Sequence, residues 1–153
     1  MSAYYFDSSA LVKRYVAEMG TAWVTGLMDP AAGNLLHAAR LAGVEVVSAF
    51  ARRLRSGSLS AGHAAAALTR FRADFRRRFL IVAIRSALVN QVMRLAERHF
   101  LRAYDAVQLA AALQVHRRCL TLGQSLTLIS ADADLNAAAI AEGVLVEDPN
   151  RHP

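Results

Sequence analysis

Short apolar runs alternate with longer segments of helical periodicity along this chain. Apolar and aromatic residues dominate 3–6, 35–38, 79–84, 126–129 and 144–146, and turn-forming or polar residues bound each run, which predicts buried strands. Apolar positions recur every three or four residues over 10–16, 21–28, 41–55, 61–78, 86–100, 105–118 and 135–142, which predicts helices. Strands that alternate with helices are typical of an α/β domain with a mainly parallel central sheet.

The composition fits one folded unit. The chain has 153 residues, 55% of them hydrophobic and 20% charged, with only 3 Pro and 8 Gly, so we expect a single domain over 1–153 and exclude a disordered or collagen-like protein. The longest stretch without Lys, Arg, Asp or Glu, Ser56 to Thr69, is shorter than the roughly 18 residues of a membrane-spanning helix. The start shows no secretory pattern, and Cys119 is the only cysteine, so we expect a cytoplasmic protein.

The basic charge is concentrated in two predicted helices. Lys and Arg number 18 against 12 Asp and Glu, a net charge of +6, which is consistent with a polyanionic partner such as nucleic acid. Arg52, Arg53 and Arg55 lie near the end of the helix predicted over 41–55, and five arginines lie within 70–78. Both groups are candidates for phosphate contacts, although an arginine-rich helix face is also often only solvated.

Five acids lie inside or at the edge of apolar runs, where a lone charge is costly to bury. They are Asp7, Glu45, Asp105, Asp132 and Asp134. Asp7 directly follows the first predicted strand, Asp132 and Asp134 follow the run 126–129, and Asp105 opens a predicted helix. Functional groups in a parallel α/β sheet collect at the carboxyl ends of the strands, so we expect Asp7, Asp105 and Asp132 to converge there and Glu45 to join them.

Glu45 has no local charge partner. Positions i+3 and i+4 from it are Ser48 and Ala49, which excludes a salt bridge within its helix. We expect it beside an apolar stripe formed by Val44, Val47, Ala51 and Leu54. For Asp7, Asp105, Asp132 and Asp134 a helix cap or an Asx-turn is the simpler explanation taken one residue at a time. Four carboxylates in one pocket would instead require a hard divalent cation such as Mg²⁺ or Mn²⁺.

Four segments together carry a family resemblance. They are Phe6-Asp7-Ser8-Ser9-Ala10-Leu11-Val12, Val44-Glu45-Val46-Val47-Ser48-Ala49, Tyr104-Asp105-Ala106-Val107-Gln108-Leu109-Ala110-Ala111-Ala112 and Leu128-Ile129-Ser130-Ala131-Asp132-Ala133-Asp134-Leu135. In this order the chain resembles a PIN domain of the VapC toxin type over essentially its whole length. The resemblance implies a three-layer α/β/α fold and a Mg²⁺- or Mn²⁺-dependent endoribonuclease. It also implies a homodimer and a small VapB-like antitoxin that blocks the acidic pocket.

The resemblance assigns the catalytic acids. It implies Asp7, Glu45, Asp105 and Asp132 as the quartet, with Asp7 and Asp105 as principal metal ligands, Asp132 as a further ligand and Ser9 as a supporting hydrogen-bond partner. Relatives often carry two acids spaced like Asp132 and Asp134, and we favour Asp132 because it lies nearer the strand end. A metal-activated water that attacks single-stranded RNA would leave a 5′-phosphate and a 3′-hydroxyl. The arginines of 70–78 would then face RNA, an antitoxin or solvent.

Other functions remain open from the residues. Haloacid-dehalogenase-type phosphotransfer needs an Asp two residues after the nucleophile, where this chain has Ser9, and a response regulator needs a late lysine, whereas Lys13 is the only lysine. Both are disfavoured. A PIN-like module that binds RNA or protein without cleavage is the remaining alternative to the nuclease.

Overall fold

A five-stranded sheet organises the fold. In the computed structural model, which describes residues 1–153, the strands are β1 (Ala3–Phe6), β2 (Leu35–Ala39), β3 (Phe79–Val82), β4 (Leu126–Ile129) and β5 (Leu145–Glu147). Every neighbouring pair is parallel, and the strand order is β3-β2-β1-β4-β5. The predicted parallel α/β architecture is therefore confirmed.

Seven helices connect the strands. They are α1 (Ser8–Lys13), α2 (Thr21–Leu27), α3 (Arg40–Arg55), α4 (Ala61–Arg77), α5 (Ser86–His99), α6 (Ala103–Thr121) and α7 (Ala133–Ala141), with short 3₁₀ turns at Pro30–Ala32 and Pro149–Arg151. The largest shifts from the predicted bounds are in α1, which begins directly after Asp7, and in α6, which begins two residues before Asp105. No helix is long and apolar enough to cross a membrane.

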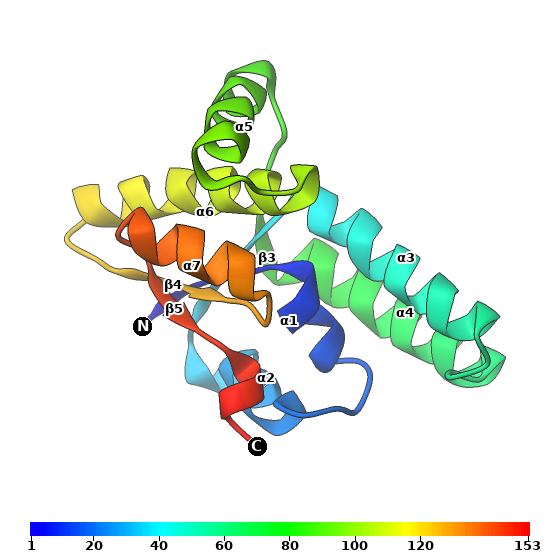
Figure 1. The fold of residues 1–153 in the computed structure, drawn as a ribbon. Coiled ribbons are helices and arrows are strands. Elements are labelled where there is room, and N and C mark those ends of the chain that lie inside the picture. Colours follow the sequence, from blue (N-terminus) through cyan, green and yellow to red (C-terminus); the bar gives the residue numbers. More distant parts are fainter.

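Helices cover both faces of the sheet, which confirms the predicted three layers (Figure 1). Adjacent strand residues point to opposite faces. Tyr5 therefore packs in one core with residues of α5, α6 and α7, while Phe6 packs in the other with residues of α1, α2, α3 and α4. Both side chains are fully buried.

The predicted apolar stripe on α3 is wrong. Val44 is 64% exposed and Leu54 is 45% exposed, whereas Ala42, Val46 and Phe50 are fully buried. The buried residues are four positions apart and so lie along one side of the helix. Packing this side places the large Phe50 ring in the core at the expense of smaller Val44. Glu45 lies next to the buried row.

The chain order creates a switch point between β1 and β4. From β1 the chain passes outward to β2 and β3, and it then returns to β4 on the other side of β1 before it reaches β5. The connections that leave β1 and β4 therefore diverge, which opens a crevice at their carboxyl ends. Asp7 directly follows β1, and Asp132 comes three residues after the end of β4.

Candidate functional site

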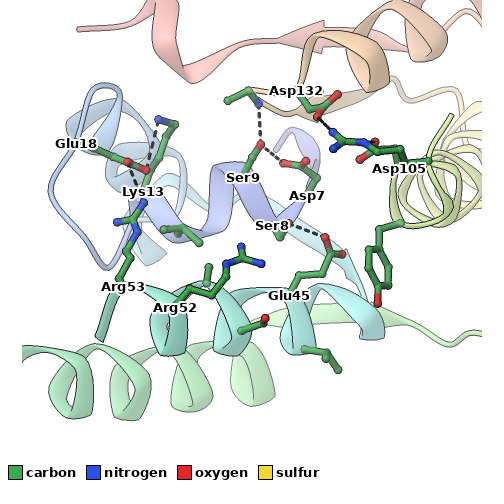
Figure 2. Close-up of a pocket in the computed structure, with 17 residues that line it drawn as sticks. Asp7, Ser8, Ser9, Lys13, Glu18, Glu45, Arg52, Arg53, Asp105 and Asp132 are labelled. Carbon is green, nitrogen blue, oxygen red and sulfur yellow. Dashed lines mark hydrogen bonds and ion pairs between the residues drawn. The ribbon is translucent and has the colours of Figure 1, made fainter. Parts of the chain in front are cut away.

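A cavity of about 590 Å³ lies at the switch point (Figure 2). Its lining includes all four predicted catalytic acids, Asp7, Glu45, Asp105 and Asp132, which come from four separate segments of the chain. Asp134 is exposed and does not line this cavity. The structure thus brings together the four acids that we expected to converge, and it places Asp132 rather than Asp134 among them.

Asp7 is the most buried of the four acids, with 4% of its surface exposed. Its Oδ1 accepts hydrogen bonds from Ser9 Oγ (2.7 Å) and from the Ala10 N–H (3.1 Å), so the residue also caps α1. Ser9 Oγ in turn accepts from the Ala131 N–H (2.9 Å), which ties the start of α1 to the segment after β4. Burial raises the pKa of Asp7 from 3.8 to about 7, against the opposing effect of these hydrogen bonds.

Glu45 is held by two side-chain donors. Ser8 Oγ donates to its Oε2 (2.9 Å), and Gln108 Nε2 donates to its Oε1 (2.6 Å). Gln108 is 1% exposed, and its Oε1 accepts from the Tyr5 hydroxyl (2.7 Å). Burial raises the pKa of Glu45, and the charge of Asp105 adds to this effect. A hydrogen-bonded chain therefore runs from the core through Gln108 to a carboxylate of the cavity.

Asp105 and Asp132 share one arginine. Arg102 Nε lies 3.4 Å from Asp105 Oδ2, and its Nη2 lies 3.6 Å from Asp132 Oδ2. The Arg102 side chain is 80% exposed, whereas those of Asp105 and Asp132 are 16% and 24% exposed. Burial and the nearby Asp132 charge raise the pKa of Asp105. A positive group therefore already stands between two of the acids.

The capping explanation holds for two of the acids and fails for a third. Asp7 caps α1, and Asp132 caps α7 by accepting a hydrogen bond from the Leu135 N–H (2.9 Å). Asp105 caps nothing, because α6 begins at Ala103 and Asp105 lies within its first turn. Capping uses only Oδ1 of Asp7 and of Asp132, and Oδ2 of Asp132 is the atom that lies 3.6 Å from Arg102 Nη2.

The acids do not form a ready-made metal site. No three His, Cys, Asp or Glu side chains anywhere in the chain are grouped closely enough to hold an ion. The donor set nevertheless suits a hard divalent cation, since it consists of carboxylate oxygens in a cavity where burial disfavours the negative charge of Asp7. The exposed Arg102 offsets part of the negative charge of the cavity, but only at Asp105 and Asp132.

Besides Arg102, three cations on the cavity wall come from α1 and α3. Lys13 is buried and donates to Asn150 Oδ1 (2.8 Å) and to the Met19 carbonyl (3.0 Å). Arg53 Nη2 pairs with Glu18 Oε2 at 3.3 Å. Arg52 lines the same cavity and forms no ion pair or hydrogen bond with a side chain. It is the cation that remains free to contact a ligand.

The arginines of 70–78 do not reach the cavity. None of them belongs to its lining, and Arg78 instead donates to the Met28 carbonyl. Arg55 is also outside the lining, although it is on the same helix as Arg52. Of the arginines that we considered for phosphate contacts, only Arg52 and Arg53 lie at the acidic cavity.

Sequence reasoning assigned no role to Gln108 and Arg102. Gln108 is a polar residue within the apolar run 106–113 and three residues after Asp105, so its setting resembles that of Glu45 and could have marked it. Arg102 precedes Asp105 by three residues, a spacing that permits an ion pair at a helix start. Its second contact, with Asp132, depends on the fold.

Fold and site together define an α/β domain with a carboxylate-lined cavity at its strand ends. Two Mycobacterium tuberculosis proteins, ribonuclease VapC45 (strain CDC 1551 / Oshkosh) and ribonuclease VapC49 (strain ATCC 25618 / H37Rv), are each 36% identical to the chain over 115 residues. The aligned region covers 75% of this chain and 78% of each relative. This chain belongs to the VapC ribonuclease family, as the four motifs indicated. No protein-family model matches it.

Solved structures agree on the fold. The structure of PAE2754 from Pyrobaculum aerophilum superposes with a TM-score of 0.63 at 20% identity, over 95% of this chain and 89% of that one. A toxin–antitoxin complex from Klebsiella pneumoniae contains a chain with a TM-score of 0.61 at 19% identity, over 95% of this chain and 96% of that one. At these identities the likeness concerns the fold alone.

Proposed function

We propose that this chain is a Mg²⁺- or Mn²⁺-dependent endoribonuclease and the toxin of a toxin–antitoxin pair. The observation that carries the proposal is the convergence of Asp7, Glu45, Asp105 and Asp132 on one cavity that also presents a free arginine. Family membership supports it, since both M. tuberculosis relatives bear the name ribonuclease.

Asp7, Asp105 and Asp132 would hold the cation. Their carboxylate oxygens are the ligands that Mg²⁺ and Mn²⁺ prefer. When bound, the cation supplies a Lewis acid that acidifies water and offsets the charge of a phosphate. Ser9 and the Ala10 N–H fix the position of Asp7, while the exposed Arg102 must release Asp105 and Asp132.

Among the four acids, Glu45 is the best candidate for the general base that accepts a proton from water. Ser8 and Gln108 fix both of its oxygens, and its raised pKa brings it nearer to the range in which a carboxylate accepts a proton from water. Water would attack the phosphorus in line and pass a proton to Glu45. The bond from phosphorus to the ribose 3′-oxygen would break, and this oxygen would take a proton from solvent, which gives a 5′-phosphate and a 3′-hydroxyl. Arg52 would hold a phosphate of the RNA against the repulsion of the acids.

The partners follow from the same proposal. We expect a small VapB-like antitoxin, in line with the Klebsiella pneumoniae neighbour, which is a toxin–antitoxin complex. We also expect a homodimer. Co-purification with the product of the adjacent reading frame tests the first expectation, and light scattering of the isolated chain tests the second.

Cleavage of RNA by the purified protein tests the activity. We expect Mn²⁺ to support cleavage of total cellular RNA and EDTA to abolish it, with 5′-phosphate ends on the products. Asp7→Asn and Asp105→Asn should each reduce the rate by at least about a hundredfold. Asn at position 7 keeps an oxygen that can accept from Ser9 and Ala10, so the fold should persist.

Asp148→Asn is the matched control. Asp148 caps the turn Pro149–Arg151 through a hydrogen bond from the Asn150 N–H and lies outside the cavity, so this variant should cleave like the wild type. Wild-type protein that binds RNA but cleaves none would support the silent binding module instead. Equal cleavage by the wild type and both site variants would refute the proposed metal site.

A further inference from the structure

Three exposed side chains follow one another between the end of α5 and the first turn of α6. Phe100 and Arg102 belong to the link from α5 to α6, and Tyr104 lies in the first turn of α6. Phe100 is 94% exposed and Tyr104 is 59% exposed. Tyr104 lines the acidic cavity, while Phe100 lines a small neighbouring hollow together with Asp134. Two exposed aromatic rings therefore lie close to each other in sequence, Tyr104 at the acidic cavity and Phe100 at the neighbouring hollow.

The Phe100 side chain contributes almost nothing to the core. Its backbone is left-handed, with φ of 55°, and it is the only non-glycine residue of the chain with a positive φ. Helices often end in this conformation, but at a glycine, which adopts it without steric cost. The ring is almost fully exposed and so adds little burial to offset that cost. A bulky aromatic residue at this position therefore points to a role at the surface.

The chemistry of the neighbouring cavity favours a nucleobase as the ligand. The acids repel phosphate groups, so RNA needs a source of binding energy that does not depend on charge near the cleaved bond. Stacking of bases on aromatic rings provides it for single strands, whose bases are accessible. Arg102 lies between the two rings in sequence and its side chain is 80% exposed, so its charge is available to a phosphate once it leaves Asp105 and Asp132.

We propose that Phe100 and Tyr104 form a base-stacking platform that holds single-stranded RNA at the rim of the acidic cavity. The proposal rests on the proposed ribonuclease function and extends it to the residues that seat the substrate. It assigns to the α5–α6 link the recognition of unpaired nucleotides on either side of the phosphate that lies over the acids.

Binding of a fluorescein-labelled 12-nucleotide oligoadenylate in EDTA, measured by anisotropy, tests the platform without cleavage. Phe100→Leu keeps a large apolar side chain but removes the flat ring, and we expect it to weaken binding about tenfold. Phe100→Trp should bind at least as tightly as the wild type. Phe100→Gly should weaken binding while it keeps or raises the melting temperature, because glycine removes the backbone strain.

Two controls make the result specific. Leu120→Ala removes a 58% exposed apolar side chain at the other end of α6, and it should leave binding unchanged. A blunt RNA duplex should bind with an affinity that Phe100→Leu does not alter, because its bases are already stacked on one another.

The outcomes separate this inference from the proposed function. If the wild type cleaves RNA and Phe100→Leu and Tyr104→Leu both bind the oligonucleotide as the wild type does, the platform is refuted and the nuclease stands. If the wild type neither binds nor cleaves any RNA, the proposed function itself fails. Loss of antitoxin binding by Phe100→Leu with RNA binding intact would assign this surface to a protein and overturn the inference.

Discussion

Replacing Arg102 by Gln should tighten the binding of Mn²⁺ to the metal-free protein. The guanidinium lies 3.4 Å from Asp105 and 3.6 Å from Asp132, so a divalent cation that uses these carboxylates must first displace it. Gln has a similar stem and can still donate a hydrogen bond, but it carries no charge. The substitution therefore removes the competing charge and keeps most of the side-chain volume.

The size of the effect follows from the two distances. A unit charge in water gains about 1.2 kcal/mol from an opposite charge at either distance, 3.4 Å to Asp105 or 3.6 Å to Asp132. Arg102 is 80% exposed, so solvent screening and the entropy of the ordered side chain reduce the sum to about 1 to 1.5 kcal/mol. This corresponds to a Mn²⁺ dissociation constant about fivefold to tenfold lower in the variant.

Isothermal titration calorimetry of the metal-free protein with Mn²⁺ measures the difference. Arg98→Gln is the control, because Arg98 is 62% exposed and pairs with Glu142 at 3.0 Å, away from the cavity. The gain from Arg102→Gln should shrink at 1 M salt, where the Debye length is about 3 Å. Unchanged or weaker Mn²⁺ binding by this variant would refute competition between the arginine and the metal.

Three further variants probe the acid, its support and the free arginine. Burial raises the folded-state pKa of Asp7 from 3.8 to about 7, so the metal-free protein should lose stability as pH rises from about 4 to about 7. Urea unfolding at pH 8 should therefore find Asp7→Asn more stable than the wild type, by up to about 4 kcal/mol. Gln108→Leu should cost about 1 to 3 kcal/mol in the same assay because it strands the buried Tyr5 hydroxyl, and Tyr5→Phe should recover part of the loss. Arg52→Gln should weaken RNA binding and flatten the slope of log K against log salt by about 0.7, whereas Arg55→Gln, outside the cavity, should affect binding less.

The strands, and the places of Asp7 and Asp132 just after two of them, were predictable because they depend on local patterns. The run 126–129 has the observed bounds of β4, since polar residues flank it on both sides. The same patterns failed on α3, where Val44 and Leu54 fit an apolar stripe but are exposed. Helical periodicity alone does not reveal which of two overlapping apolar rows the rest of the core will cover, and here the packing of Phe50 decides it.

The contacts between distant segments were not predictable from one sequence. Gln108 reaches Glu45 across 63 positions and Tyr5 across 103, and neither partner follows from spacing. Only the fold shows that Asp132 lines the cavity and Asp134 does not, because the two residues differ by less than one helical turn. The choice of Asp132 as a metal ligand, made because it lies nearer the strand end, stays a prediction.

Two of the four acids, Asp7 and Glu45, are held more firmly than the other two, Asp105 and Asp132. This difference predicts which carboxylates would move when a metal binds. Asp7 and Glu45 each accept two hydrogen bonds from groups anchored in the fold, so their positions are set before a cation arrives. Asp105 and Asp132 are held by fewer such groups: Asp132 accepts one hydrogen bond, from the Leu135 N–H, and one exposed arginine lies against both carboxylates. A cation that displaces Arg102 needs to order only these two carboxylates. The conformational entropy of ordering Asp7 and Glu45 is lost when the chain folds, so it does not weaken metal binding. Metal binding should therefore protect the backbone amides at the starts of α6 and α7 from hydrogen exchange more than those of α1 and α3.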